Sequence, residues 1–247
     1  MTVTAGQSGL ARMRTTVAVA CRILAQQGLA DGVLGHVSAR LDDDRILLRC
    51  RGPRDRGLLF TVADDIRMIG LDGRGELEGG YAPPSEMHIH TELYRARSDV
   101  RAVVHAHPRE VMVADLARIA LRQTFGAYNI PASQLARRGV PVYPRPVLIS
   151  TPALGRAVAA AVGHDGAAIL RGHGIVTVGD SVEQATMLAL DLVELSRIAT
   201  QVALLGGRPQ ALRAEDRGGL PDLGHAFNDL SRWRHYVGRL EFAGLGV

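Results

Sequence analysis

Histidine residues with the spacing of metal ligands stand out first in this sequence. The apolar, β-branched segment over residues 99–108 reads as a buried strand that carries His105 and His107. Side chains alternate along a strand, so the two imidazoles point to the same side, about 7 Å apart along the backbone. His173, in a glycine-flanked turn, offers a third ligand. Three imidazoles leave an open position on a divalent cation, which is typical of a catalytic metal site.

A carboxylate that could move a proton lies upstream of these histidines. Glu86 begins a predicted short amphipathic helix, whose N-terminal end favours a negative charge, and it is a candidate general base beside the metal. His90 follows one helical turn later and either supports the site or packs the helix, and packing is favoured. A lone histidine in a strand is usually a core residue, and Glu86 alone would be an ordinary helix-terminal charge. Their joint occurrence indicates a metal-dependent active site.

Hydrophobic periodicity and capping residues predict the elements that must hold these side chains. Helices are expected over about 10–24, from residue 86, over about 109–120, from residue 151, from Ser181 to about 206, and in a C-terminal segment after residue 221. Strands are expected within 32–41, over 45–50, from 99, at the proline-flanked stretch 140–144, up to residue 170 and over 175–178. Hairpins and crossovers are mixed, which favours an α/β fold with a mixed or mainly antiparallel sheet between helices.

The motifs together resemble the class II aldolase/adducin family in order and spacing. They are Gly35-His36-Val37-Ser38, Ser85-Glu86 with His90, His105-x-His107-Pro and Gly172-His173-Gly174. The resemblance runs from about residue 11 to residue 207. It implies that His105, His107 and His173 bind one divalent ion per subunit. Zinc is the default from ligand type, and manganese, cobalt or iron would also suit.

The same resemblance implies an architecture and an assembly. The expected fold is a three-layer α/β/α arrangement with a central mixed, mainly antiparallel sheet. One domain spans residues 1–247, with a core over about 11–207 and a helical tail over 221–247. Enzymes of the family commonly form homotetramers with active sites near subunit contacts, so one C-terminal aromatic residue, Trp233 or Tyr236, is expected to reach a neighbouring site.

Departures from the family's phosphate pocket bear on the substrate. Sugar-phosphate aldolases of the family hold phosphate with Gly-Asn-x-Ser, Ser-Gly and Ser-Ser-Glu, where this sequence has His36, Arg51 and Pro84 in place of three hydrogen-bonding residues. This version resembles the branch that decarboxylates hydroxylated aromatic acids. It implies loss of CO₂ from a dihydroxy aromatic dicarboxylate, with a dihydroxyphthalate as the leading candidate. The alternatives are aldol cleavage of a sugar phosphate and, more remotely, a non-catalytic adducin-like interaction module.

Specific residues are assigned to these roles. Besides the metal ligands, the catalytic candidates are Glu86, His36 and Tyr128. Tyr128 is an alternative proton donor. An anionic substrate is expected to contact His36, Ser38, Arg51, Ser85, Arg171 and Tyr236, because guanidinium groups bind carboxylates through two parallel hydrogen bonds.

Composition excludes several other classes of protein. All 29 basic residues are arginine, so no Schiff base, pyridoxal phosphate attachment or P-loop lysine can form. The net charge of +4 comes with only 4% aromatic residues, which leaves few platforms for stacking nucleic acid bases. No apolar run approaches the roughly 20 residues of a membrane span. With two cysteines and no evident signal peptide, a reduced cytoplasmic protein is the expectation.

Overall fold

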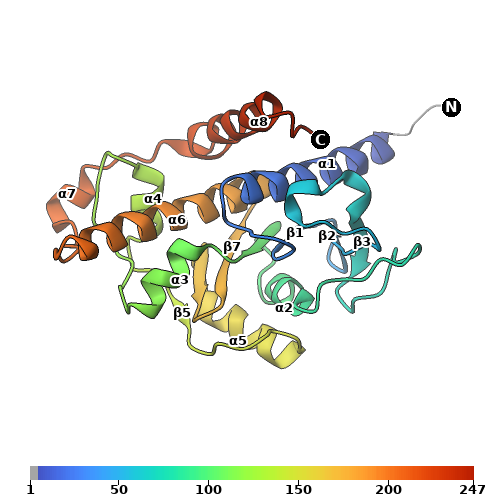
Figure 1. Cartoon of the computed structure of the whole chain (residues 1–247), viewed down its shortest axis with the longest axis horizontal. Helices are drawn as coiled ribbons and strands as arrows, with labels where there is room; N and C mark the ends of the chain where they lie inside the picture. Colours follow the sequence, from blue (N-terminus) through green and yellow to red (C-terminus); the bar gives the residue numbers. More distant parts are fainter. Residues whose placement is uncertain (1–4) are drawn as a thin grey trace.

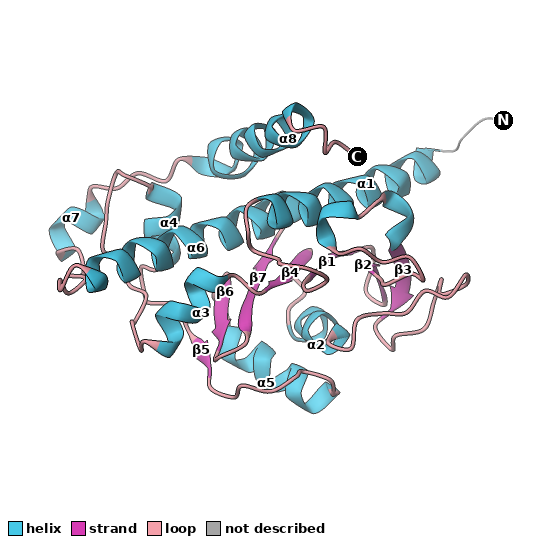
Figure 2. Cartoon of the chain, viewed as in Figure 1, coloured by secondary structure: helices cyan, strands magenta, loops and turns pink. Residues whose placement is uncertain are grey.

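The computed structural model describes residues 5–247, which fold around one mixed sheet with helices on both faces (Figures 1 and 2). The strands are β1 (His36–Arg40), β2 (Arg45–Arg49), β3 (Ile66–Gly70), β4 (Ala102–Ala106), β5 (Val142–Tyr143), β6 (Ala167–Leu170) and β7 (Gly174–Gly179). Over the described residues their order is β3-β2-β1-β4-β7-β6-β5, and all neighbours are antiparallel except β5 and β6. The expected mixed, mainly antiparallel sheet is confirmed.

The helices form the two outer layers. One face of the sheet packs against α1 (Ala5–Gln26), α3 (Arg109–Leu116) and α6 (Val182–Leu204), and the other against α2 (Met87–Ala96) and α5 (Pro152–Val162). The short α4 (Ile130–Leu135) packs on α6, and α8 (Arg232–Phe242) lies against α1 and α6. Short 3₁₀ turns (Leu58–Phe60, Ala63–Asp65), α7 (Ala214–Gly218) and a π-helical turn (Ala226–Ser231) complete the description. Figure 1 shows the long α1 and α6 on one side and α2 and α5 on the other.

Alternation along β1 decides which side chains face the site. Val37 and Ala39 belong to the core beneath α1 and α6, so His36 and Ser38 point to the opposite face, where they meet α2. In β4, which pairs antiparallel with β1, His105 lies directly opposite His36. The sheet therefore presents polar groups from two adjacent strands to one helix.

Two predicted boundaries differ from the structure. The helix expected to reach residue 120 ends at Leu116, because Arg118 adopts a left-handed backbone conformation with φ of 59°. The connection before residue 221 contains the short helix α7. No helix within residues 5–247 combines the length and apolar character needed to span a membrane.

A close approach between α5 and α2 fixes the helix that begins at Glu86. Gly155 of α5 lies so near α2 that a Cβ atom there would stand 2.4 Å from the carbonyl oxygen of His88 and 2.8 Å from Cγ of Glu92. Only a residue without a side chain fits this contact. Gly155 thus helps set the position of α2 over the sheet.

We expect Gly155→Ala to lower the free energy of unfolding by about 1–3 kcal/mol, because the two helices must move apart. Chemical denaturation with a two-state fit measures the change. Gly238→Ala in α8 is the matched control: a Cβ there meets nothing within 4 Å, so stability should stay level or rise by up to about 1 kcal/mol. Equal effects of the two substitutions would contradict the close-packing account.

Candidate metal centre and active site

Four metal-ligating side chains converge where β4, β7 and the start of α2 meet. Glu86, His105, His107 and His173 each place a ligand atom so that all four lie within 4.8 Å of one another. The Nε2 atoms of His105 and His107 are 2.8 Å apart. The Glu86 carboxylate lies 3.4 Å from Nε2 of His105 and 3.3 Å from Nε2 of His173. The structure thus brings together the three histidines and the carboxylate that the sequence singled out.

Backbone contacts orient these side chains. Nδ1 of His105 lies 2.8 Å from the carbonyl oxygen of Ile175 and donates to it, which leaves Nε2 with a lone pair directed into the cluster. The amide of His107 donates to the carbonyl oxygen of Leu29 at 2.9 Å. His173 stands in the turn between β6 and β7. The next residue, Gly174, allows close approach of the strands, since a Cβ there would lie 2.4 Å from the carbonyl oxygen of Ala106.

The cluster combines an ionised carboxylate with at least one histidine whose neutral form is favoured, His107. Burial would raise the pKa of Glu86, but contacts with His105 and His173 and a hydrogen bond from the Ile149 amide hold that pKa well below its usual range. Burial, together with the neighbouring histidines, lowers the pKa of His107 to about 3. Neutral imidazole is the form that binds metal.

The donor set fits a divalent cation. Three imidazole nitrogens and one carboxylate oxygen are ligands that Zn²⁺ and other first-row metals accept. The contacts of 3.3 and 3.4 Å between Glu86 and two histidines are close to the ligand separation around an ion with bonds of about 2.0–2.1 Å, and the 2.8 Å contact between His105 and His107 is shorter. These four residues are therefore suited to hold one metal ion.

A cavity of about 510 Å³ opens onto this cluster. It is lined by the charged or polar residues His36, Arg51, Ser85, Glu86, His107 and His173, and by Leu34, Gly35, Pro84, Pro146, Val147, Leu148 and Gly172. The guanidinium of Arg51 is partly exposed and donates to the carbonyl oxygen of Val33 at 3.1 Å. Sequence reasoning missed the apolar wall over residues 146–148, because nothing local marks that loop as part of a site.

Behind His36 runs a buried row of hydrogen bonds that sequence reasoning also missed. Nδ1 of His36 lies 2.6 Å from Nε2 of His90, Nδ1 of His90 lies 2.6 Å from Oγ of Ser38, and that oxygen lies 2.7 Å from the hydroxyl of Tyr94. Ser38 and His90 are fully buried. Ser38 therefore does not line the cavity, which corrects its assignment to substrate binding. His90 does more than pack α2, and the spacing of 86, 90 and 94 on one helix face was the available signal.

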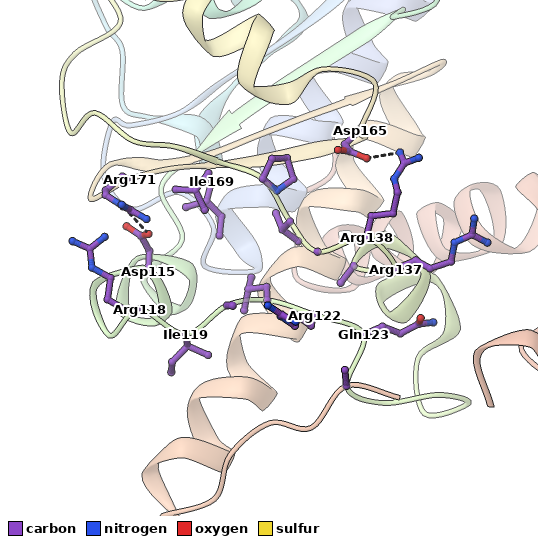
Figure 3. A pocket seen from close by; sticks show the side chains of 18 of the residues that line it. Asp115, Arg118, Ile119, Arg122, Gln123, Arg137, Arg138, Asp165, Ile169 and Arg171 are labelled. Atoms are coloured by element: carbon purple, nitrogen blue, oxygen red, sulfur yellow. Dashed lines mark hydrogen bonds and ion pairs between the residues drawn. The ribbon is translucent and has the colours of Figure 1, made fainter. Parts of the chain in front are cut away.

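Arg171 also departs from its predicted role. Its Nε lies 3.4 Å from Oδ1 of Asp115 in α3, and the amide of Gly172 donates to the same carboxylate at 2.8 Å. The side chain therefore lines a separate cavity of about 690 Å³, where Figure 3 shows the Arg171–Asp115 pair on one side and the Arg138–Asp165 pair on the other. Arg171 thus lies outside the cavity at Glu86, and its assignment to substrate binding stays a prediction.

The two predicted tyrosines share another cavity. Tyr128 and Tyr236 both line a space near α6 and α8, and the exposed hydroxyl of Tyr128 donates to Glu194 at 2.7 Å. Neither lines the cavity at Glu86, so within one chain they do not act on a ligand bound there. The roles given to Tyr128 and Tyr236 therefore stay predictions. Contact of a C-terminal aromatic residue with a neighbouring subunit stays a prediction.

Comparisons with known proteins agree with this architecture and identify the family. Residues 15–200 match the model of the class II aldolase and adducin N-terminal domain. A 3,4-dihydroxyphthalate decarboxylase from Arthrobacter keyseri is 48% identical over 93% of this chain and 94% of its own length. An L-fuculose phosphate aldolase from Escherichia coli is 25% identical over 72% of this chain and 78% of its own. The crystal structure of an aldolase II superfamily protein from Pseudomonas syringae superposes with a TM-score of 0.80 over 96% of this chain and 94% of its own, at 21% identity.

Metal binding provides a direct test of the cluster. We expect the purified chain to bind one divalent ion. His107→Ala and His173→Ala should each weaken that binding by more than about 100-fold, because removing a ligand costs more affinity than removing a residue that only hydrogen-bonds to a ligand. Glu86→Gln should retain the ion, because the three imidazoles remain. Elemental analysis and competition with a chelating indicator measure both.

His164→Ala serves as the control for these variants. His164 is an exposed histidine outside the cluster, so its removal should leave the stoichiometry and affinity unchanged. Full metal binding by His173→Ala would overturn the ligand assignment.

Proposed function

The chain belongs to the class II aldolase and adducin family, and we propose that it is a metal-dependent carbon–carbon lyase that decarboxylates a dihydroxy aromatic dicarboxylate. The leading substrate is 3,4-dihydroxyphthalate, by similarity to the relative that is 48% identical over 93% of the chain. Its product would be protocatechuate. The supporting observation in the structure is that His36 and Arg51 share one cavity with the metal-ligating cluster.

The cavity suits a flat ring that carries two carboxylates. Pro84, Pro146 and Leu148 offer apolar surface to the ring. The Arg51 guanidinium presents two N–H groups in the geometry that a carboxylate accepts. The opposite edge of the ring, with a hydroxyl and the reacting carboxylate, would then lie toward Glu86 and the histidines. Ser85, exposed at the rim, is placed to donate a further hydrogen bond.

His105, His107 and His173 would hold the cation, which would supply a Lewis acid beside Glu86. Glu86 is the carboxylate that lines this cavity, so we assign it as the group that takes the proton of the substrate hydroxyl. When the ring-to-carboxylate bond breaks, CO₂ leaves and the electron pair stays on the ring carbon. Glu86 then returns that proton to the ring carbon, the phenolate oxygen of the product takes up a proton from solvent, and His36 offers a hydrogen bond from the cavity wall.

Other assignments remain predictions that follow from the family. Zinc as the native metal, a homotetramer with active sites near subunit contacts and a cytoplasmic location all belong to this group. Aldol cleavage of a sugar phosphate is the alternative activity, since a relative named for it is 25% identical and the electronic event is the same. His36, Arg51 and Pro84 replace its phosphate-binding residues, and this favours the decarboxylase. The convergence of four ligand-type side chains argues against a non-catalytic interaction module.

An assay of the metal-loaded chain with 3,4-dihydroxyphthalate and with L-fuculose 1-phosphate tests the proposal. We expect CO₂ release and protocatechuate from the aromatic acid, and little cleavage of the sugar phosphate. Arg51→Ala should raise KM for the aromatic acid by about 10- to 100-fold, because a charged hydrogen bond worth about 1.5–3 kcal/mol is lost. Glu86→Gln should lower kcat by at least about 100-fold.

Arg54→Ala is the matched control for Arg51. Arg54 lies three residues further along the same loop and lines a different cavity, so its removal should leave KM unchanged. Efficient cleavage of the sugar phosphate without CO₂ release from the aromatic acid would refute the proposed reaction.

A further inference from the structure

The row of hydrogen bonds behind His36 is closed at its inner end. The hydroxyl of Tyr94 contacts Oγ of Ser38 at 2.7 Å and has no other side-chain or backbone acceptor among residues 5–247. Tyr94 is 2% exposed, and Ser38 and His90 are fully buried. A buried O–H without an acceptor is unfavourable, so the hydroxyl of Tyr94 donates its hydrogen bond to Oγ of Ser38.

Counting donors then fixes every proton in the row. A serine hydroxyl has a single proton, and with Tyr94 donating to its oxygen the remaining partner for that proton is Nδ1 of His90, 2.6 Å away. Nδ1 of His90 must therefore be the acceptor, and Nε2 carries the proton of this ring. That N–H donates to Nδ1 of His36 across 2.6 Å. The reverse direction would leave the Tyr94 proton unpaired in the interior.

We propose that Tyr94, Ser38 and His90 are positioning residues that hold His36 as the Nε2–H tautomer, with that N–H available to a ligand in the cavity. Nδ1 of His36 is engaged by His90, and His36 lines the cavity beside Glu86 and His107, so Nε2 is the nitrogen that remains for an incoming group. His36 is then a hydrogen-bond donor and not a proton acceptor.

The fold provides this arrangement through two regular spacings. Ser38 and His36 lie two residues apart on β1 and point to the same face. His90 and Tyr94 lie four residues apart on α2 and form one stripe with Glu86. The row therefore alternates between the two elements: His36 and Ser38 come from β1, and His90 and Tyr94 come from α2.

The consequence for catalysis rests on the proposed function. A neutral N–H fixed beside the reacting carboxylate stabilises negative charge as it develops on a substrate oxygen, and it cannot compete with Glu86 for the substrate proton. The tautomer itself does not depend on which substrate the cavity takes. An experiment can therefore refute the tautomer of His36 without refuting the proposed decarboxylation, and the reverse.

The test uses the full chain labelled with ¹⁵N-histidine. Long-range ¹H–¹⁵N correlation spectra show which ring nitrogen carries the proton, and His36→Gln and His90→Gln assign the two rings. We expect a single tautomer for each ring, protonated at Nε2. In Ser38→Ala the His90 ring loses its donor, so both rings should populate a mixture of tautomers. If the proposed reaction holds, kcat should fall about tenfold while KM stays within about twofold.

Ser196→Ala is the matched control, because Ser196 is equally buried but donates to the carbonyl oxygen of Leu192 within α6. It should leave the tautomers and kcat unchanged. A His36 ring protonated at Nδ1 in the unsubstituted chain would overturn the proposal, and this measurement does not require Ser38→Ala to fold. An unchanged Nε2–H tautomer of His36 in Ser38→Ala would also overturn the proposal.

Discussion

The antiparallel pairing of β1 with β4 is the constraint on which the site depends. Its register sets His36 opposite His105 and Ser38 opposite Val103, and alternation turns both polar residues of β1 toward α2. A slip of one residue would move them into the apolar layer under α1 and α6. Because both faces of this sheet are covered by helices, the apolar residues between the polar ones hold the register.

The second requirement is electrostatic. Glu86 carries its negative charge at the start of α2, where the Ile149 amide and two histidines stabilise the ionised form and offset the cost of burial. The position of α2, and so of this carboxylate, depends on its close contact with Gly155. Beside the carboxylate stands His107, whose lowered pKa favours the neutral form of its ring. Such a group of donors suits a cation, and Arg51 lines the same cavity.

The metal cluster could be predicted from sequence because local rules place it: strand alternation aligns His105 with His107, and a glycine-flanked turn presents His173. The mainly antiparallel sheet followed in the same way from short strands and hairpin turns. The roles of Ser38 and His90 could not be predicted, since they depend on how α2 lies over β1. The contact of Arg171 with Asp115 could not be predicted for a similar reason: Asp115 belongs to a helix that is distant in the sequence, and no local pattern indicates the contact.

The location of a bound metal tests the central claim most directly. Anomalous diffraction at the zinc edge, from crystals of the zinc-loaded chain, should give one peak per chain within about 2.0–2.1 Å of a ring nitrogen from each of His105, His107 and His173. The peak should lie at the wall of the cavity that holds His36 and Arg51. A peak at other residues, or no peak at this cluster in fully loaded protein, would contradict the account.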